Sequence, residues 1–290
     1  MPAESLMDRF RKIVIEYGPW TAHNIRLPGD LFTIRKDDEP MSRIRARRTL
    51  QIVSDLLRRP IGELRVLDLG CLEGGFSIEF GMWGAEVVGI DGRAANIAKA
   101  EFAREALQLK NVSFLREDIR GLRATKHGTF DVVLCLGVFY HLPQKDLLPF
   151  LHSLRAMTRS IVILDTHISL SPEKIFTAEG QTLSGRTFLE HPPGSTALQR
   201  EKALWKSLDT EDSFWLTEAS LLRALHTVGF TSVHACLHPP SASTPIDRKT
   251  YVVCAGKPVQ PRVMSPREIP AAFECSHYEP GQDPLMRKQS

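Results

Sequence analysis

Short apolar runs alternate with segments of helical periodicity between residues 65 and 164. Each run is continuous rather than alternating, which is typical of a parallel strand that is covered on both faces. The runs predict strands at Arg65–Cys71, Glu86–Ile90, Val112–Leu115, Phe130–Leu136 and Ser160–Leu164. The segments between them predict helices at Glu73–Trp83, Ala94–Leu109 and Gln144–Met157. This order predicts an α/β fold with a doubly wound, mostly parallel sheet.

The flanking regions are less regular. Leu6, Phe10 and Ile13 recur at helical spacing, and a second helix is expected at about Met41–Leu57. Residues 168–213 are rich in Gly, Pro, Ser and Thr, so we expect a long irregular insertion that serves as a lid. A helix with Thr217 as N-cap and Gly229 as C-cap follows, and then two strands, Ser232–Leu237 and Thr250–Ala255.

These patterns divide the chain into three parts. Residues 1–60 form an N-terminal helical cap, and residues 61–257 form the sheet domain with its insertion at 168–213. Residues 258–290 are rich in proline and charge and are expected to be flexible.

Composition bounds the function only loosely. The chain has 290 residues and a net charge of +3, which is too small to indicate nucleic-acid or membrane binding by itself. Its five cysteines show no C-x-x-C spacing, and four of them (Cys71, Cys135, Cys236 and Cys254) fall in predicted strands, as buried residues do in a reducing compartment. Without a recognisable signal or membrane-spanning segment, we expect a cytoplasmic protein.

The strongest motif is the run from Val66 to Phe76, which predicts a strand, a glycine turn and a helix N-terminus. Asp68 in this run would repel a pyrophosphate but attract a ligand that carries an amino group and a positive sulfur. Leu72 stands where a dinucleotide fingerprint needs its second glycine, and the sequence has no Walker-type phosphate loop. The motif therefore favours S-adenosylmethionine over NAD or ATP, although glycines that serve only the turn geometry are the alternative.

Two further acids follow the next strands. Asp91 ends the second strand and is placed to accept the ribose hydroxyls, and Asp118 ends the third, where Ile119 would contact the adenine ring. An acid at a strand end is often only a helix cap. Three acids at the ends of three successive strands, however, suit a nucleoside that has no phosphate and bears a sulfonium.

The chain resembles the class I S-adenosylmethionine-dependent methyltransferases over roughly residues 60–257. The matching segments are Val66–Cys71 with Gly74, Ile90–Asp91, Glu117–Ile119 and Phe130–Val138. The resemblance implies a seven-stranded sheet in which the last strand, Thr250–Ala255, is antiparallel. Leu72 departs from the glycine of many members. The expected cofactor-binding residues are Asp68, Gly70, Cys71, Leu72, Gly74, Asp91, Gly92, Asp118, Ile119, Leu136 and Gly137.

A looser likeness concerns Gly137–Leu142, together with Pro19-Trp20, Leu27–Gly29 and Ser213–Trp215. These segments are similar to a group that contains tRNA wobble-uridine carboxymethyltransferases and small-molecule methyltransferases. The likeness keeps both an RNA and a small molecule open as the acceptor.

Three residues near strand ends are candidates for proton transfer: His141, Asp165 and His167. A hydroxyl acceptor needs a base, and histidine suits neutral pH. Asp165 and His167 are two apart in an extended segment, so they share a face and can form a base with its orienting acid. His141 can instead pack on the cofactor or cap a helix, and His167 can have only a structural role in its loop. A further alternative is that the three residues together bind a divalent metal.

Aromatic and histidine side chains in the covering segments are candidates for acceptor binding. They are Tyr17, Trp20, His23, Tyr140 and Trp215, and Phe188 and Phe214 are close to them in sequence. Ordinary packing is the alternative, especially for Phe214. As loop histidines, His23 and His191 are expected at the surface rather than as catalysts.

Arg43, Arg45, Arg47 and Arg48 form a basic stripe on a predicted helix, and either Arg43 or Arg47 can point into the cofactor cleft. The leading hypothesis is methylation of a small-molecule oxygen in biosynthesis, without nucleic acid, membrane or metal. The alternatives are an RNA-modifying methyl- or carboxymethyltransferase and a non-catalytic binder. The sequence does not predict the oligomeric state.

Overall fold

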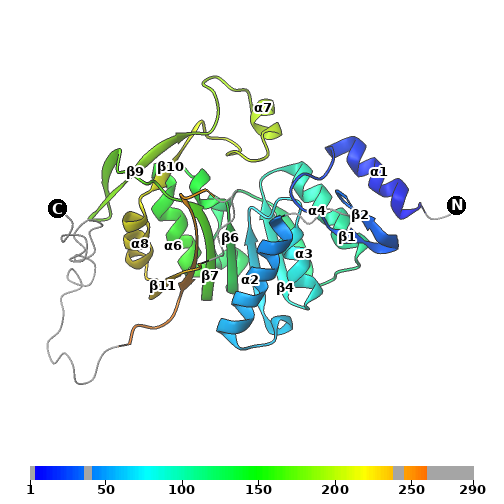
Figure 1. Ribbon diagram of the computed structural model, residues 1–290, viewed down its shortest axis with the longest axis horizontal. Helices are drawn as coiled ribbons and strands as arrows, with labels where there is room; N and C mark the ends of the chain where they lie inside the picture. Colours follow the sequence, from blue (N-terminus) through cyan, green and yellow to red (C-terminus); the bar gives the residue numbers. More distant parts are fainter. Residues whose placement is uncertain (1–3, 36–40, 238–244, 260–290) are drawn as a thin grey trace.

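A seven-stranded sheet forms the centre of the computed structural model, which describes residues 4–35, 41–237 and 245–259 (Figure 1). The strand order is β11-β12-β7-β6-β3-β4-β5. The strands are β3 (Arg65–Leu69), β4 (Glu86–Asp91), β5 (Val112–Arg116), β6 (Phe130–Leu136), β7 (Thr158–His167), β11 (Ser232–Ala235) and β12 (Arg248–Cys254). β12 runs antiparallel to the other six strands of this sheet, which are parallel to one another. The doubly wound sheet with an antiparallel last strand is thereby confirmed.

Helices cover both faces of this sheet (Figure 1). One face carries α2 (Met41–Leu57), α3 (Gly75–Met82) and α4 (Ala94–Ala106), with α1 (Leu6–Tyr17) packed on α4. The other carries α5 (Ala124–His127), α6 (Leu147–Met157) and α8 (Glu218–Thr227). Successive residues of β6 alternate between the two cores: Val132 and Leu134 pack on the first, Val133 and Cys135 on the second. Because both faces of the strand are buried, successive residues must be apolar, which explains the continuous apolar runs in the sequence.

The turn between β3 and α3 depends on left-handed backbone. Gly70, Leu72 and Gly74 have φ values of 64°, 49° and 80°. A Cβ on Gly74 would lie 2.7 Å from the Phe114 ring and 2.8 Å from Ala100, so only glycine fits there. Leu72 adopts the same region at a cost that its neighbours must offset. Cys71 lies in this turn and not in the strand, contrary to the prediction.

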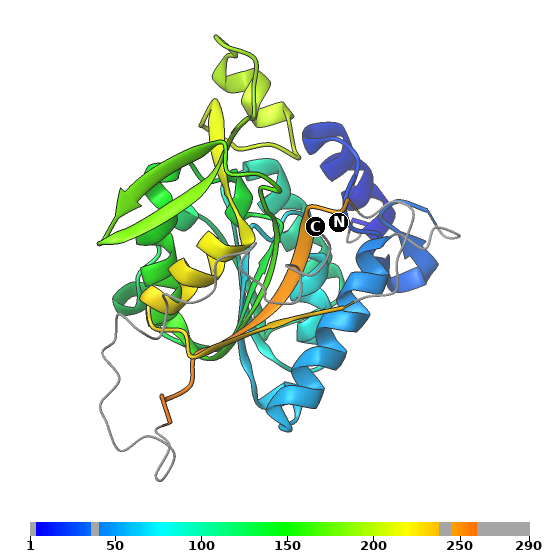
Figure 2. The same ribbon diagram turned by 60° about the vertical axis from the view of Figure 1, so that its left-hand side comes forward.

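The expected irregular insertion is largely ordered, which corrects the prediction. A second, antiparallel sheet has the order β10-β9-β8. Its strands are β8 (Lys174–Ala178), β9 (Gln181–Leu189) and β10 (Asp212–Leu216), and α7 (Ala197–Lys202) lies between the last two. Glu179 and Gly180, both with positive φ, form the tight turn of the β8–β9 hairpin. Figure 2 shows this hairpin and α7 at the same end of the molecule.

Part of the N-terminal segment is fixed against the β3–α3 turn. The buried Glu73 carboxylate accepts hydrogen bonds from the backbone N–H groups of Thr21, Ala22 and His23 at 2.8–3.1 Å. Buried Lys99 lies 3.4 Å from this carboxylate and donates to the carbonyl oxygen of Pro19. The chain then forms a short hairpin of β1 (Arg26–Leu27) and β2 (Leu31–Phe32).

Smaller differences concern element ends. The fifth predicted strand extends to His167, and Gln144–Asp146 is a 3₁₀ turn before α6. Cys236 follows β11 rather than lying within it, whereas the predicted cap by Thr217 is confirmed, because its side chain accepts from the Ser220 N–H. Further 3₁₀ turns are Pro28–Asp30, Ile61–Glu63, Ile119–Gly121 and Phe139–His141.

Most of the tail predicted to be flexible, residues 260–290, lies outside the described residues, as do 238–244. None of the described helices combines the length and the apolar character that a membrane crossing requires.

Candidate active site

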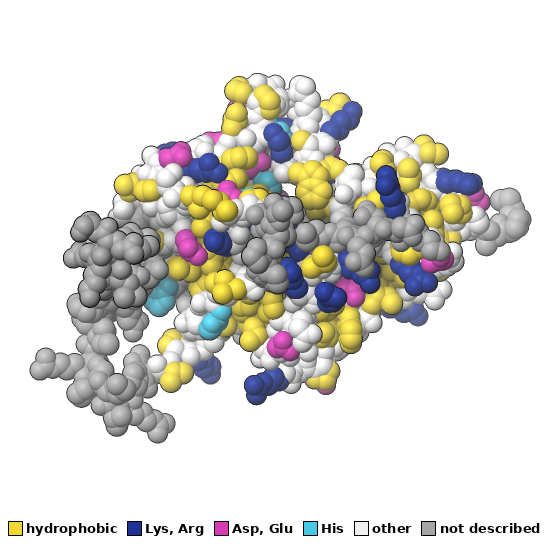
Figure 3. Space-filling model, viewed as in Figure 1, with side chains coloured by type: hydrophobic (Ala, Val, Ile, Leu, Met, Phe, Trp, Pro, Cys, Tyr) yellow, Lys and Arg dark blue, Asp and Glu magenta, His cyan; other side chains and the backbone are white. Residues whose placement is uncertain are grey.

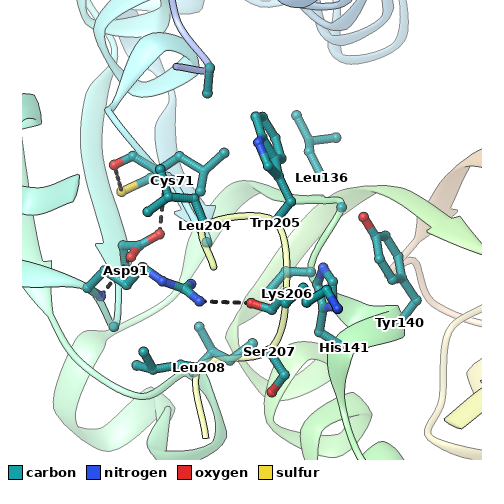
Figure 4. A pocket seen from close by; sticks show the side chains of 18 of the residues that line it. Cys71, Asp91, Leu136, Tyr140, His141, Leu204, Trp205, Lys206, Ser207 and Leu208 are labelled. Atoms are coloured by element: carbon teal, nitrogen blue, oxygen red, sulfur yellow. Dashed lines mark hydrogen bonds between the residues drawn. The ribbon is translucent and has the colours of Figure 1, made fainter. Parts of the chain in front are cut away.

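A cavity of about 550 Å³ opens at the carboxyl ends of β3, β4, β5 and β6. Ligands of doubly wound sheets bind at this edge, because the loops diverge there. The cavity is also lined by Thr21–His23 of the N-terminal segment and by residues 204–210 of the insertion. In Figure 4, Leu204–Leu208 cross the cavity between Asp91 on one side and Tyr140 and His141 on the other.

Asp91 combines a local structural role with exposure to the cavity. Its Oδ2 accepts from the Leu72 N–H at 3.0 Å, and its Oδ1 accepts from the Arg93 N–H at 2.8 Å and from Asn96 at 3.0 Å. Burial raises the pKa of this carboxyl group. Asp91 therefore orders the glycine turn and still lines the cavity, where a ribose can donate to it.

Asp68 is a buried acid whose oxygen accepts from the Ser77 hydroxyl at 2.6 Å. Burial raises its pKa to about 7, although the Ser77 hydrogen bond acts in the opposite direction. A positive charge in the cavity would relieve this penalty, so Asp68 favours a cationic ligand.

Asp118 is held by an arginine. Its carboxylate pairs with Arg120 at 2.6 Å, and Arg120 also pairs with Asp209 of the insertion. Burial raises the pKa of Asp118, but the Arg120 hydrogen bonds outweigh this effect and hold the pKa below its ordinary value. An adenine amino group bound at Asp118 would therefore share the carboxylate with the Arg120 guanidinium.

Of the predicted cofactor residues, all but one line the cavity. They are Asp68, Gly70, Cys71, Leu72, Asp91, Gly92, Asp118, Ile119, Leu136 and Gly137. Gly74 does not line it, because it packs against Phe114 and Ala100 beneath the turn.

His141 and Tyr140 line the other side of the cavity, in the 3₁₀ turn after β6. The Nδ1 of His141 lies 2.8 Å from Oε1 of Glu190, which is fully buried. Glu190 also accepts from the Ser213 hydroxyl at 2.7 Å and the Ser207 N–H at 3.1 Å. Burial raises the pKa of Glu190, but these hydrogen bonds outweigh it and the pKa lies below its ordinary value. Sequence reasoning missed Glu190, since nothing local distinguishes it in the insertion.

The predicted pair of Asp165 and His167 does not form. Asp165 is bound by Arg248 and Arg45, and His167 Nδ1 lies 3.0 Å from the carboxylate of Asp247. Neither Asp165 nor His167 is among the cavity-lining residues. Arg248 and Asp247 come from about 80 residues away because β12 pairs with β7, whereas Arg45 comes from α2.

Three of the predicted acceptor contacts also lie away from the cavity. Trp20 is buried against Phe10, Tyr17 ends α1, and Trp215 stacks on His167 and Phe188. Trp20 and Trp215 are therefore packing residues, as the alternative interpretation expected. Phe214 is likewise buried, in an edge-to-face contact with Phe176.

The other two predicted acceptor contacts, His23 and Tyr140, line the cavity, and so does Trp205, which was not predicted. His23 is buried, contrary to the surface expectation, and its Nδ1 accepts from the Gly75 N–H at 3.0 Å. Burial lowers its pKa to about 4, so the ring is neutral at physiological pH. Trp205 extends into the cavity in Figure 4 and is 63% exposed. His191 is also buried, and its Nε2 contacts the Ser207 carbonyl.

Arg93 ties the insertion to the cofactor side. Its guanidinium donates to the carbonyl oxygens of Arg200, Glu201, Ala203 and Lys206 at 2.9–3.3 Å. Because Arg93 follows Asp91 by two residues, the segment that crosses the cavity is anchored beside the expected ribose site.

The predicted basic stripe contributes one residue to the cavity. Arg45 lines it, whereas Arg43 and Arg47 do not. On the face in Figure 3, Lys and Arg side chains are interspersed with acidic and apolar ones. Within the described part of the chain, no three His, Cys, Asp or Glu residues are grouped as metal ligands.

Residues 66–160 match the family model described as a methyltransferase domain. The chain is 30% identical over 146 residues to the O-antigen chain terminator bifunctional methyltransferase/kinase WbdD of Escherichia coli, which covers 47% of this chain and 20% of that protein. It is 31% identical over 85 residues to the ubiquinone biosynthesis O-methyltransferase of Albidiferax ferrireducens, covering 29% of this chain and 34% of that protein.

The fold is similar to the N-terminal domain of EvdMO1, solved in the presence of SAH and D-fucose. The TM-score is 0.65 at 24% identity, over 87% of this chain and 96% of that one. The chain spans about a fifth to a third of the length of the two curated relatives. Residues 66–160 of the chain are therefore similar to a methyltransferase domain, and the seven-stranded sheet that contains them has the Rossmann-like fold of such domains.

Proposed function

We propose that the protein transfers a methyl group from S-adenosylmethionine to a hydroxyl oxygen of a small-molecule acceptor, with His141 as the base. The observation that carries this proposal is the His141–Glu190 pair at the wall of the cavity, opposite the acids of the cofactor side. The relatives' names support an oxygen acceptor, since one is a ubiquinone biosynthesis O-methyltransferase.

The chemistry of the cavity fits the cofactor. Asp68 is a buried acid with a pKa raised to about 7, which a cationic ligand would complement. Asp91 and Asp118 add further carboxylate acceptors at neighbouring strand ends, an arrangement suited to ribose and adenine donors and unsuited to a pyrophosphate. When bound, S-adenosylmethionine supplies an activated methyl group and leaves as S-adenosylhomocysteine.

The protein's part in the reaction is alignment and proton removal. Nδ1 of His141 is engaged by Glu190, so Nε2 is the ring nitrogen that can take the acceptor's proton. The acceptor oxygen then forms a bond to the methyl carbon as the carbon–sulfur bond breaks. The proton stays on His141, and the negative charge of Glu190 stabilises the resulting imidazolium.

The insertion encloses this reaction. Trp205 and its neighbours cross the cavity, and Arg93 holds them in place. Enclosure excludes water from the methyl donor and limits the acceptor to a compound that fits the remaining space. A small molecule therefore suits the site better than a base within a folded RNA.

A labelled methyl donor, presented with pools of hydroxylated metabolites and with tRNA, tests the proposal. We expect label in a small acidic or neutral alcohol or phenol. The His141→Ala variant should lose at least about 100-fold in kcat while its dissociation constant for S-adenosylhomocysteine stays within about twofold.

The matched control is His152→Ala, because His152 makes a similar 2.8 Å contact with Glu179 on the exposed surface. Label in tRNA, or full turnover by His141→Ala, would contradict the acceptor class or the base respectively.

A further inference from the structure

Two arginines from distant parts of the chain meet around one carboxylate beside Tyr140. Arg248 of β12 donates to Asp165 Oδ1 through Nε at 2.8 Å, and its Nη2 lies 2.6 Å from the same oxygen. Arg45 of α2 approaches that oxygen with its Nη2 at 3.2 Å. Arg45 and Arg248 both line the cavity, whereas Asp165 lies behind them.

Both oxygens of this single carboxylate already have partners. Its second oxygen, Oδ2, accepts from the Thr250 hydroxyl at 2.7 Å. Arg45 Nη2 is buried yet makes no hydrogen bond, since it has the distance of an ion pair without the geometry of a hydrogen bond. Asp165 therefore cannot satisfy both guanidinium groups, and donors remain for another acceptor.

The charges do not balance either. Two guanidinium groups and one carboxylate leave an excess of +1 at the cavity wall. Among the other described groups near this cluster, Tyr140 is a neutral phenol whose pKa burial raises, and His23 is neutral because burial lowers its pKa to about 4. The carboxylate of Glu190 keeps its negative charge, but its hydrogen-bond partners are His141, Ser207 and Ser213, so it pairs with neither arginine. A partly buried excess of positive charge is costly unless a ligand offsets it.

The position of the cluster connects it with the acceptor. A Cβ on Gly137 would lie 3.0 Å from Arg248 Nη2, so this guanidinium lies against the end of β6. Tyr140 and His141, on the proposed acceptor side, follow Gly137 within four residues, and the Arg248 guanidinium lies 5.7 Å from the Tyr140 ring.

We propose that Arg45 and Arg248 form a binding subsite for an anionic oxygen group, a carboxylate or a phosphate, and that the acceptor carries this group. The inference deepens the proposed function and rests on it for the identity of the ligand: the acceptor is a hydroxylated acid. A guanidinium presents parallel N–H donors that match the oxygens of such groups, and partly buried charge-assisted hydrogen bonds are strong enough to select for them. The amino-acid carboxylate of the cofactor has the same chemistry and is the other possible source.

Calorimetry with the full chain tests the subsite without requiring turnover. Benzoate and inorganic phosphate are titrated into protein saturated with S-adenosylhomocysteine. We expect one of them to bind, and we expect Arg45→Met and Arg248→Met to weaken that binding at least tenfold. The matched controls are Arg47→Met, an exposed arginine of the same helix, and Lys249→Met, the neighbour of Arg248 on β12.

A second titration identifies the source of the anion. S-adenosylhomocysteine is compared with 5′-methylthioadenosine, which lacks the amino-acid moiety. Equal affinities of wild type and Arg45→Met for both nucleosides place the anion on the acceptor. A loss of at least tenfold for S-adenosylhomocysteine alone keeps the anion subsite but overturns its assignment to the acceptor.

If neither titration responds to Arg45→Met or Arg248→Met, the inference is wrong and the cluster only joins α2 to the sheet. Arg45→Met remains informative if Arg248→Met does not fold, because in Arg45→Met the Arg248 guanidinium still pairs with Asp165 and the Thr250 hydroxyl still donates to it. If the protein transfers methyl groups but neither arginine variant changes anion binding, this inference alone is overturned. An anion bound through Arg45 without methyl transfer would overturn the proposed function instead.

Discussion

Glu190 of the insertion contacts His141 of the 3₁₀ turn after β6, with 2.8 Å between Oε1 and Nδ1. The acid is fully buried, while the histidine lines the cavity. Ser207, which is part of the segment that crosses the cavity, donates its N–H to the same carboxylate. The orientation of the proposed base and the position of the covering segment therefore depend on one side chain.

Replacement of Glu190 by Gln should lower kcat by roughly 10- to 100-fold, because the amide keeps the volume but no longer stabilises a charged imidazole. The affinity for S-adenosylhomocysteine should not change, since the glutamine keeps an oxygen that can accept from the Ser207 N–H and so hold the covering segment. Steady-state kinetics with the labelled donor measure the first quantity and calorimetry the second. Glu179→Gln, which alters an exposed His–Glu pair, is the control. Unaltered kcat would remove Glu190 from the mechanism.

Replacement of Asp91 by Ala should weaken cofactor binding by roughly 1.5–3 kcal/mol, the value of hydrogen bonds to a charged acceptor. The same change leaves the Leu72 and Arg93 N–H groups without their acceptor, so the turn will also loosen. Calorimetry measures the loss of binding free energy, and thermal unfolding measures the loss of stability that comes from the loosened turn. Asp55→Ala on the exposed side of α2 should change neither. Wild-type affinity would exclude the ribose assignment.

Cofactor affinity should increase as the pH rises from about 6 to about 8. Burial raises the pKa of Asp68 to about 7, so the empty site holds much of this acid in its protonated form. A cationic ligand favours the ionised form and lowers that pKa, which means that binding releases a proton. Calorimetry in buffers of different ionisation enthalpy detects the release. Asp68→Asn keeps an acceptor for Ser77 and should abolish both effects; their persistence would assign them to another group.

The free energy of unfolding should fall as the pH drops from about 6.5 to about 4. Burial lowers the pKa of folded His23 from 6.5 to about 4, so the unfolded state binds more protons in this window. The loss amounts to about 3 kcal/mol at most. His23→Asn keeps an acceptor for the Gly75 N–H and should show less dependence in urea titrations.

The difference between the His23→Asn and wild-type curves isolates this group, because Asp68 acts in the opposite direction: its pKa is raised, so its contribution falls as the pH rises. His226→Asn at the surface is the control. Parallel curves for His23→Asn and wild type would show that His23 does not titrate as described.

Replacement of Arg93 by Met should release the covering segment. The variant loses the donors to four carbonyl oxygens of residues 200–206. We expect S-adenosylhomocysteine to dissociate about tenfold faster and residues 190–211 to be cleaved sooner by protease, because a segment that lacks its anchors opens more often. Arg104→Met on α4 is the control. Unchanged dissociation would mean that the segment does not control cofactor exit.

Local patterns predicted the central sheet well. Each strand of the parallel region is a continuous apolar run with a charged or glycine residue at its end, so the positions of β3, β4, β5 and β6 follow from residues that are neighbours in the chain. The glycine turn and the acids Asp68 and Asp91 belong to the same local signal, and the cavity does contain them. The β8–β9 hairpin was missed because its only cue, the Glu179-Gly180 turn, lies in a polar segment.

The order of strands and helices in the central sheet, the edge at which the cavity opens and the acidic residues that line it all follow from residues close together in the chain. The partners of the chemically active side chains depend instead on contacts between distant segments. Glu190 reaches His141 across 49 positions, and Arg248 reaches Asp165 across 83. Such pairs form because the second sheet and the antiparallel β12 fold back onto the carboxyl edge, and no local periodicity encodes which side chains then meet.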